Sequence, residues 1–137
     1  PLQMAMIADA IANKGKMMQP YLVDHIESDT GNVIKKFNSK VIAQPLSEEE
    51  SIEMTKIMEA VVDEGTATKL DTDAYNVAGK TGSAEFGNEK GHSHAWFVGF
   101  TTGDDSIVVC VMLEDAGSGG ASAAPVAKKI FDSYYLD

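Results

Sequence analysis

The chain has little of what disulfide bonding, membrane insertion or nucleic-acid binding requires. Among its 137 residues there is a single cysteine, Cys110, so no internal disulfide can form. The longest uninterrupted apolar run, residues 107–113, is far shorter than the roughly 20 residues that span a bilayer. Eleven basic residues stand against 21 acidic ones, giving a formal net charge of -10. This balance argues against a nucleic-acid partner and against contact between this segment and an anionic membrane.

The few residues that could bind a metal or act as a nucleophile are poorly placed to do so. Cys110 lies inside an apolar strand-like segment, whereas a reactive thiol needs an exposed and electropositive setting. His92 and His94 would share one strand face, but no third cluster of ligand-type residues accompanies them. We therefore expect no metal and no cofactor, and structural or solvated roles for the histidines.

Helical spacing of apolar residues predicts three helices, over about residues 2–14, 48–64 and 122–135. Gly15 ends the first of them. Ser47 and Glu50 have the spacing of a capping box, which makes the acidic run after Ser47 a helix start and not a calcium site. Ser122 is the expected N-cap of the last helix.

Strong β-formers and tight turns predict a three-stranded antiparallel sheet, over about residues 75–85, 94–101 and 106–113. Residues 87–91 are expected to form the loop after the first of these strands, and residues 117–120 a flexible loop. A small peripheral hairpin is expected around the turn at residues 29–32. Helices before and after a run of antiparallel strands indicate a single α+β domain with helices packed on the sheet.

Residues 79–85, Gly-Lys-Thr-Gly-Ser-Ala-Glu, carry the most informative chemistry of the chain. On a strand, Thr81 and Ser83 share a face about two residue rises of 3.3 Å apart, so one carboxylate could contact both hydroxyls. Lys80 adds a cation, and Gly82 lacks the β-carbon that would keep another backbone away. The segment has the composition of an anion-recognition strip that a bound peptide could approach.

Two plainer interpretations of the same residues compete with this one. A phosphate-binding loop would need glycine at position 74, where the chain has Ala74, and a helix starting at Lys80, where Gly82 follows at once. An ordinary surface strand with a solvated lysine is the other alternative, because the triplet Lys-Thr-Gly is common by chance. The residues around the triplet decide against both.

Lys-Thr-Gly is the third signature of penicillin-binding proteins and serine β-lactamases, and neighbouring blocks resemble that superfamily in the expected order. The blocks are residues 1–5, 15–21, 65–67, 78–85 and 94–100, which run through nearly the whole chain. Ala84-Glu85 after the triplet and His94-Ala95 before Trp96 resemble the C-terminal half of a monofunctional, class B penicillin-binding protein. Ser83 departs from the threonine of many relatives but keeps a hydroxyl.

The nucleophile of that family is missing from this chain. Its serine lies in an S-x-x-K motif and a second serine in S-x-N, but no serine here has lysine three residues later or asparagine two residues later. We therefore expect residues 1–137 to be the C-terminal portion of a transpeptidase domain, with the nucleophile half and two strands upstream. The resemblance implies the partial penicillin-binding protein/serine β-lactamase-like fold.

The resemblance also implies a function. The longer protein would be a D,D-transpeptidase that cross-links peptidoglycan stem peptides ending in D-Ala-D-Ala, binds β-lactams and works on the extracytoplasmic face of the bacterial membrane. Lys80, Thr81 and Ser83 would be the catalytic residues of this segment, and with Gly82 they would bind the substrate carboxylate. A β-lactam sensor, a serine β-lactamase and a non-catalytic binding module remain alternatives.

Strand alternation raises one difficulty, because it places Lys80 on the face opposite Thr81 and Ser83. All three can serve one ligand only at a twisted edge beside a cleft. The strand over residues 107–113 raises a different issue, since it is apolar, uncharged and without proline. In the isolated chain it would present an unpaired edge, so a homodimer that pairs these edges is expected.

Overall fold

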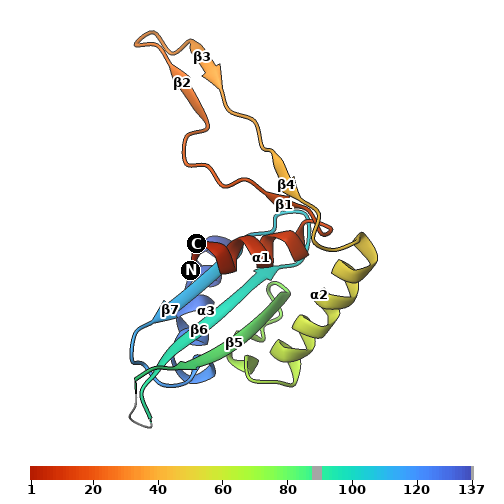
Figure 1. Ribbon diagram of the computed structural model, residues 1–137, viewed down its shortest axis with the longest axis vertical. Helices are drawn as coiled ribbons and strands as arrows, with labels where there is room; N and C mark the ends of the chain where they lie inside the picture. Colours follow the sequence, from red (N-terminus) through yellow and green to blue (C-terminus); the bar gives the residue numbers. More distant parts are fainter. Residues whose placement is uncertain (88–90, 137) are drawn as a thin grey trace.

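The computed structural model describes residues 1–87 and 91–136, and it is built around one antiparallel sheet (Figure 1). Part of the loop predicted at residues 87–91 therefore lies outside the described residues. The sheet has the order β5-β6-β7, formed by β5 (Val77–Glu85), β6 (Ser93–Thr101) and β7 (Val108–Leu113). These strands confirm the predicted three-stranded sheet to within two residues at each end.

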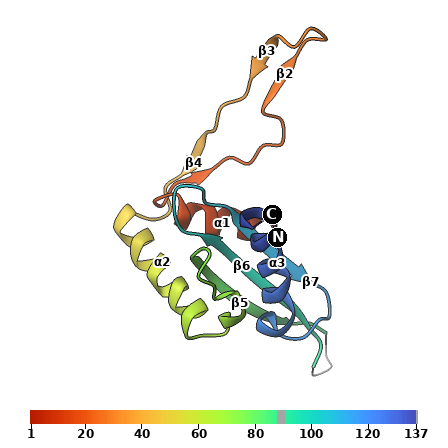
Figure 2. The same ribbon diagram turned by 180° about the vertical axis from the view of Figure 1, so that it is seen from behind.

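Helices cover both faces of the sheet and flank one of its edges. α1 (Leu2–Ala12) and α3 (Ala124–Tyr135) lie on opposite faces, and α2 (Glu48–Asp63) runs beside β5 (Figures 1 and 2). The core between the sheet and α3 includes Phe97 and Phe131, which are fully buried. A smaller core on the α1 face joins Ala8 to buried residues of α2, β5 and β6. The α+β class is confirmed.

The start of α2 confirms the predicted capping box. The backbone N–H of Ser47 donates to the Glu50 carboxylate at 2.7 Å, and the backbone N–H of Glu50 donates to the Ser47 hydroxyl at 3.2 Å. Two orphan donors of the first turn are thereby satisfied, and three acids lie at the positive end of the helix dipole. The capping box therefore stabilises the N-terminus of α2, the helix that packs beside β5.

The start of α3 differs from the prediction. Residues Gly119–Ala123 form a π-helix, η2, whose first turn is capped by the Ser118 hydroxyl, which accepts from the Ala121 N–H at 3.3 Å. Ser122 is not an N-cap, because its hydroxyl donates to the Ala116 carbonyl at 2.6 Å. The expected flexible loop over residues 117–120 is also wrong in its second half, since Gly119 is buried against the sheet.

A long arm, residues 19–40, projects from the body of the molecule (Figure 1). It contains the predicted hairpin, in which β2 (His25–Glu27) pairs with β3 (Val33–Lys36), and every residue of the two strands is exposed. The base of the arm is a short ladder between β1 (Met17–Met18) and β4 (Val41–Ala43), which the sequence did not indicate. A 3-10 turn, η1 (Thr68–Leu70), links α2 to β5.

Candidate functional site

The residues of the strip lie on the two faces of β5, as strand alternation requires. Thr81 is opposite Phe97 in the register and belongs to the α3 face, where it is only 7% exposed. Lys80 is opposite Val98, which packs against the α1 core, and its side chain is exposed. Ser83 shares the face of Thr81 but is exposed. The cation and the hydroxyls therefore lie on opposite faces of β5 and can reach one ligand only at the edge of the strand.

Lys80 reaches that edge by folding over its own strand. Its Nζ donates to the Thr81 carbonyl at 2.6 Å. The Lys80 side chain borders a hollow of ≈ 390 Å³. The other residues that line this hollow are Met4, Thr81, Gly82, Ala84, Trp96 and Val98. Lys80 is the one charge among these described lining residues, so an anion entering the hollow finds a cation and no competing carboxylate.

The bond from Lys80 also shows which backbone groups face outward. In an antiparallel pair, alternate residues direct both N–H and C=O toward the neighbour or away from it. The Thr81 carbonyl accepts from a side chain, which places Thr81 in the outward series, and Ser83, two residues on, belongs to the same series. Within the described residues no strand pairs with the outer side of β5. The Ser83 N–H is thus available to a ligand lying along this edge.

Each hydroxyl of the strip has a hydrogen-bond partner that is distant in sequence. The Thr81 hydroxyl lies 2.5 Å from the Thr66 hydroxyl, and the Ser83 hydroxyl accepts from the Gly119 N–H at 3.3 Å. Sequence reasoning did not place Thr66 or Gly119 at the site. Thr66 could have been found from its position in the block at residues 65–67, which resembles the family. Gly119 gave no signal in the sequence, because only the fold brings it close to the backbone of Gly82 and Trp96.

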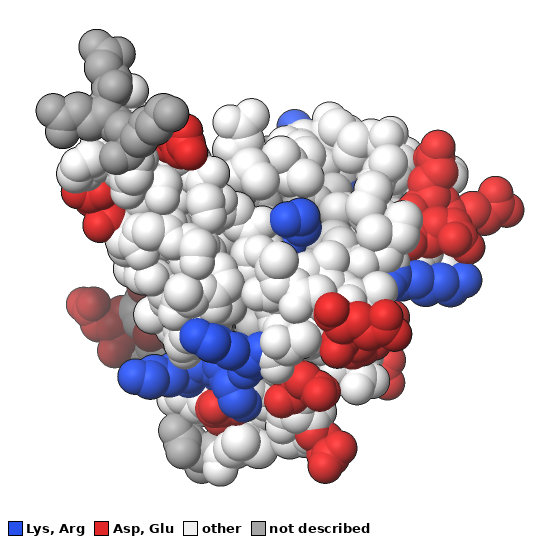
Figure 3. Space-filling model, turned by 90° about the horizontal axis from the view of Figure 1, so that it is seen from below, with Lys and Arg blue, Asp and Glu red and all other residues white. Residues whose placement is uncertain are grey.

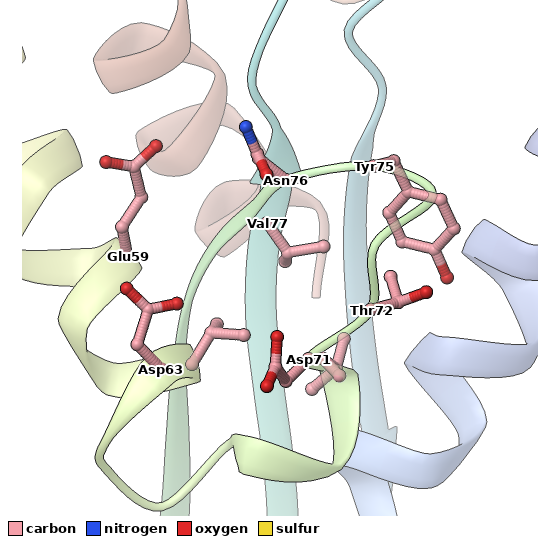
Figure 4. A pocket seen from close by; sticks show the side chains of 9 residues that line it. Glu59, Asp63, Asp71, Thr72, Tyr75, Asn76 and Val77 are labelled. Carbon is pink, nitrogen blue, oxygen red and sulfur yellow. The ribbon is translucent and has the colours of Figure 1, made fainter.

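A second hollow, of ≈ 220 Å³, lies away from the strip between α2 and the segment that leads into β5 (Figure 4). Carboxylates of Glu59, Asp63 and Asp71 border it, together with Tyr75. This pocket suits no anionic ligand, since three negative charges would repel one. An anionic ligand would therefore meet less repulsion at the edge of β5 than in this pocket.

Charged side chains elsewhere on the molecule are spread over the surface. On the face shown in Figure 3, acidic side chains lie at both margins and near the bottom, a group of basic side chains lies at the lower left, and much of the centre carries no charge. In the described part of the chain, no three residues of the types His, Cys, Asp and Glu come together as a metal site would require. His92 instead lies 2.9 Å from a carboxylate oxygen of Asp115. The groups at the β5 edge that suit an anion are therefore a lysine, hydroxyls and backbone N–H groups.

Comparison with known proteins identifies the family. Residues 1–132 match the penicillin binding protein transpeptidase domain. The chain belongs to this family. It is 34% identical to the peptidoglycan D,D-transpeptidase MrdA of Haemophilus influenzae, an alignment that covers 100% of this chain and 24% of that protein. The transpeptidase segment thus spans about a quarter of the length of the curated relatives it matches.

Solved transpeptidase structures share the fold. The D,D-transpeptidase domain of a peptidoglycan glycosyltransferase from Eggerthella lenta superposes with a TM-score of 0.81 at 34% identity, covering 99% of this chain and 33% of that one. Penicillin-binding protein A of Mycobacterium tuberculosis, solved as a ceftriaxone acyl-enzyme complex, gives a TM-score of 0.85 at 28% identity, covering 97% of this chain and 31% of that one. The class B resemblance inferred from the sequence is confirmed.

No helix among the described residues has the length and apolar character that crossing a membrane demands.

Cys110 is half-buried in β7, and burial raises the pKa of its thiol above the ordinary value. A thiol in that state is a poor nucleophile at neutral pH, so Cys110 is a packing residue.

Proposed function

We propose that the longer protein containing this chain is a peptidoglycan D,D-transpeptidase, and that this chain supplies the wall that binds the substrate carboxylate and the oxyanion. One observation carries the proposal: in a member of this family, Lys80 bonds the outward carbonyl of Thr81 on the unpaired edge of β5, the strand that also bears the Thr81 and Ser83 hydroxyls. A peptide ending in a carboxylate can lie along such an edge as an added strand. The edge offers it a cation, hydroxyls and an outward N–H.

The proposed reaction proceeds through a serine acyl-enzyme. A serine upstream of this chain attacks the carbonyl between the two D-Ala residues, its oxygen bonds to that carbon, and the terminal D-Ala leaves as the amine. An amine of a neighbouring stem peptide then attacks the acyl carbon and regenerates the serine hydroxyl. The Ser83 N–H would stabilise the negative oxygen in each step, an interaction whose loss typically costs about 3 kcal/mol.

Carboxylate binding and proton transfer would involve side chains on both faces of β5. Lys80 would approach the carboxylate from the α1 side and support proton transfer at the upstream motifs, while Thr81 and Ser83 would donate from the α3 side. Gly82 lies between them, and a β-carbon there would touch only the Cβ of Trp96, at 3.5 Å. The space beside Gly82 is therefore open to a ligand backbone.

Residues 1–137 would form the C-terminal portion of the transpeptidase domain, acting on the extracytoplasmic side of the membrane. The isolated chain is then expected to be inactive, because none of its serines has lysine three residues later. Intact-mass analysis after incubation with benzylpenicillin should show the unmodified mass. A stoichiometric adduct on any serine would contradict the assignment of the nucleophile to another part of the protein.

Acylation kinetics of the longer protein test the role of the strip. We expect Lys80→Ala to lower the second-order rate of acylation by benzylpenicillin roughly 100-fold, because it removes the charge that holds the carboxylate. Ser83→Thr should lower it far less, since threonine keeps the hydroxyl and the backbone N–H. Equal losses in the two variants would show that Lys80 is only a solvated surface charge.

The free edge of β7 is the second surface for which we propose a partner. The strand has no neighbour on its outer side within the described residues, although α1 and α3 cover its faces. In the longer protein an upstream strand would pair with it, and in the isolated chain a second copy would do so in an antiparallel dimer. Light scattering during size exclusion of the isolated chain should therefore give a dimer mass.

A further inference from the structure

Thr66 lies beside Thr81, with the two hydroxyl oxygens 2.5 Å apart, and is the more exposed residue of the pair. The local structure holds its backbone in place. The chain leaves α2 through Gly65, where a β-carbon would come within 2.8 Å of the Val61 carbonyl oxygen. Ala67 is fully buried, and its N–H donates to the same Val61 carbonyl at 3.1 Å. Gly120 of η2 closes on the other side, since a β-carbon there would lie 2.5 Å from the Thr66 carbonyl oxygen. Thr66 is thus fixed between two tight backbone approaches.

The 2.5 Å contact between the two threonine hydroxyls has two possible directions. If Thr81 donates its proton to Thr66, it has none left for a ligand. If Thr66 donates to Thr81, the Thr81 proton is free. A carboxylate only accepts hydrogen bonds, so a bound carboxylate selects the second arrangement. The resulting chain runs from Thr66 to Thr81 to the ligand, and each bond in it polarises the next.

Gly119 imposes the same order on Ser83. Its N–H donates to the Ser83 oxygen at 3.3 Å, which leaves the Ser83 proton to point elsewhere. Only glycine fits there, because a β-carbon on residue 119 would lie 2.3 Å from the Trp96 carbonyl oxygen and 2.5 Å from that of Gly82. The two hydroxyls of the strip are therefore supported in the same way, one by a threonine hydroxyl and one by a backbone N–H.

We propose that Thr66 is a positioning residue for carboxylate recognition: it donates to Thr81 and so makes Thr81 a donor to the substrate, in parallel with the action of the Gly119 N–H on Ser83. This proposal rests on the function proposed above. It predicts that Thr66 affects discrimination between a free carboxylate and its ester, because an ester lacks the charge that both hydroxyls recognise.

The experiment uses the longer protein and two probes, benzylpenicillin and its methyl ester. The quantity measured is the ratio of their second-order acylation rates. Thr66→Val, which removes the hydroxyl at nearly constant size, should lower this ratio about tenfold, the effect of one hydrogen bond to a charged group. Thr66→Ser keeps the hydroxyl and should leave the ratio within about twofold of the unchanged protein.

A merely structural role predicts a different result, since both rates would then fall together and the ratio would stay constant. Thr66→Val in a Thr81→Val background provides the second measurement. There the hydroxyl it removes no longer has a partner, so we expect no further change in the ratio. A tenfold drop in that background, or an unchanged ratio in Thr66→Val alone, would overturn the proposal.

The two proposals fail in different ways. Absence of any preference for the free carboxylate in the unchanged protein would count against the proposed function itself. A clear preference that Thr66→Val does not alter would count only against the positioning role. Should Thr66→Val melt below the assay temperature, Thr66→Ser and Thr66→Cys, whose thiol donates weakly, provide the same comparison, with a lowered ratio expected for cysteine alone.

Discussion

The two edges of the sheet are built for different partners. The edge at β5 carries a lysine and two hydroxyls, the strand is flanked by α2, and each hydroxyl has a hydrogen-bond partner from another part of the chain. The edge at β7 carries no charged side chain, and Val109 and Val111 are buried under α3. A strand edge that binds a polar ligand thus needs further residues, here Thr66 and Gly119, whose hydrogen bonds orient its donors. A strand edge that pairs with another strand needs only its backbone groups and covered faces.

The largest effect on stability is expected at Gly119, which packs closely against β5 and β6. Gly119→Ala would place a β-carbon against two backbone carbonyl oxygens that cannot move aside, so we expect a loss of about 3 kcal/mol in the free energy of unfolding. Gly82→Ala is the matched control, because its β-carbon meets only an ordinary contact, and it should cost less than about 1 kcal/mol. Urea unfolding of the longer protein measures both.

Gly82→Ala should nonetheless impair the reaction. The new methyl group would occupy the space that the proposed ligand backbone needs, so acylation by benzylpenicillin is expected to slow at least about tenfold at nearly unchanged stability. This separation of stability from activity distinguishes the ligand side of β5 from its packed side. A variant that acylates at the normal rate would show that no ligand lies beside Gly82.

A smaller effect is expected where α3 is fastened to the start of β5. The Tyr75 hydroxyl donates to the Asp132 carboxylate at 2.5 Å, and Lys128 lies 3.0 Å from the same oxygen. The bond from Tyr75, and then that from Lys128, holds the pKa of Asp132 below its ordinary value. Tyr75→Phe should therefore cost about 1 kcal/mol near neutral pH.

The pH dependence of that cost follows from the sign of the shift. A carboxyl whose pKa is depressed in the folded state stabilises the fold above the ordinary pKa, and this contribution is lost as the pH falls through the folded value. The difference between Tyr75→Phe and the unchanged protein should thus shrink below about pH 4. A difference that stays constant down to pH 2 would show that Asp132 does not carry the interaction.

The smallest effect is expected for a substitution at the edge of β7, which should change the association of the isolated chain and not its folding. Met112 is partly exposed on the strand, so Met112→Lys should convert the expected dimer of the isolated chain to a monomer by placing like charges together. Ser106→Lys, outside β7 and exposed, serves as the control and should leave the dimer intact. A monomer for the unchanged chain at high concentration would remove the dimer proposal.

Much of the fold could be predicted because its signals are local. The capping box at Ser47, the apolar period of α1 and the β-formers of β6 each lie within one element, and all three were predicted correctly. The ladder between β1 and β4 was missed, because β1 contains only Met17–Met18 and so shows no alternation. Ser122 was wrongly predicted as the N-cap of α3, because a π-helix capped by Ser118 precedes that helix and has no distinct sequence pattern.

The candidate site likewise contains residues with a local sequence signal and residues that only the fold brings together. Lys80, Thr81 and Ser83 are consecutive or nearly so, and their chemistry could be inferred from the strand on which they lie. Thr66 and Gly119 act across 15 and 36 residues of sequence, and only the packing of α2 and η2 against β5 brings them to the strip. Residues that support a site from a distance leave no pattern in its motif.

The central claim is that the edge of β5 binds the carboxylate of the substrate. A crystal structure of the longer protein acylated by benzylpenicillin tests it most directly. We expect carboxylate oxygens of the adduct within about 3 Å of the Thr81 and Ser83 hydroxyls, with the Ser83 N–H at a similar distance from the acyl oxygen. A carboxylate bound more than about 4 Å from both hydroxyls would contradict the account.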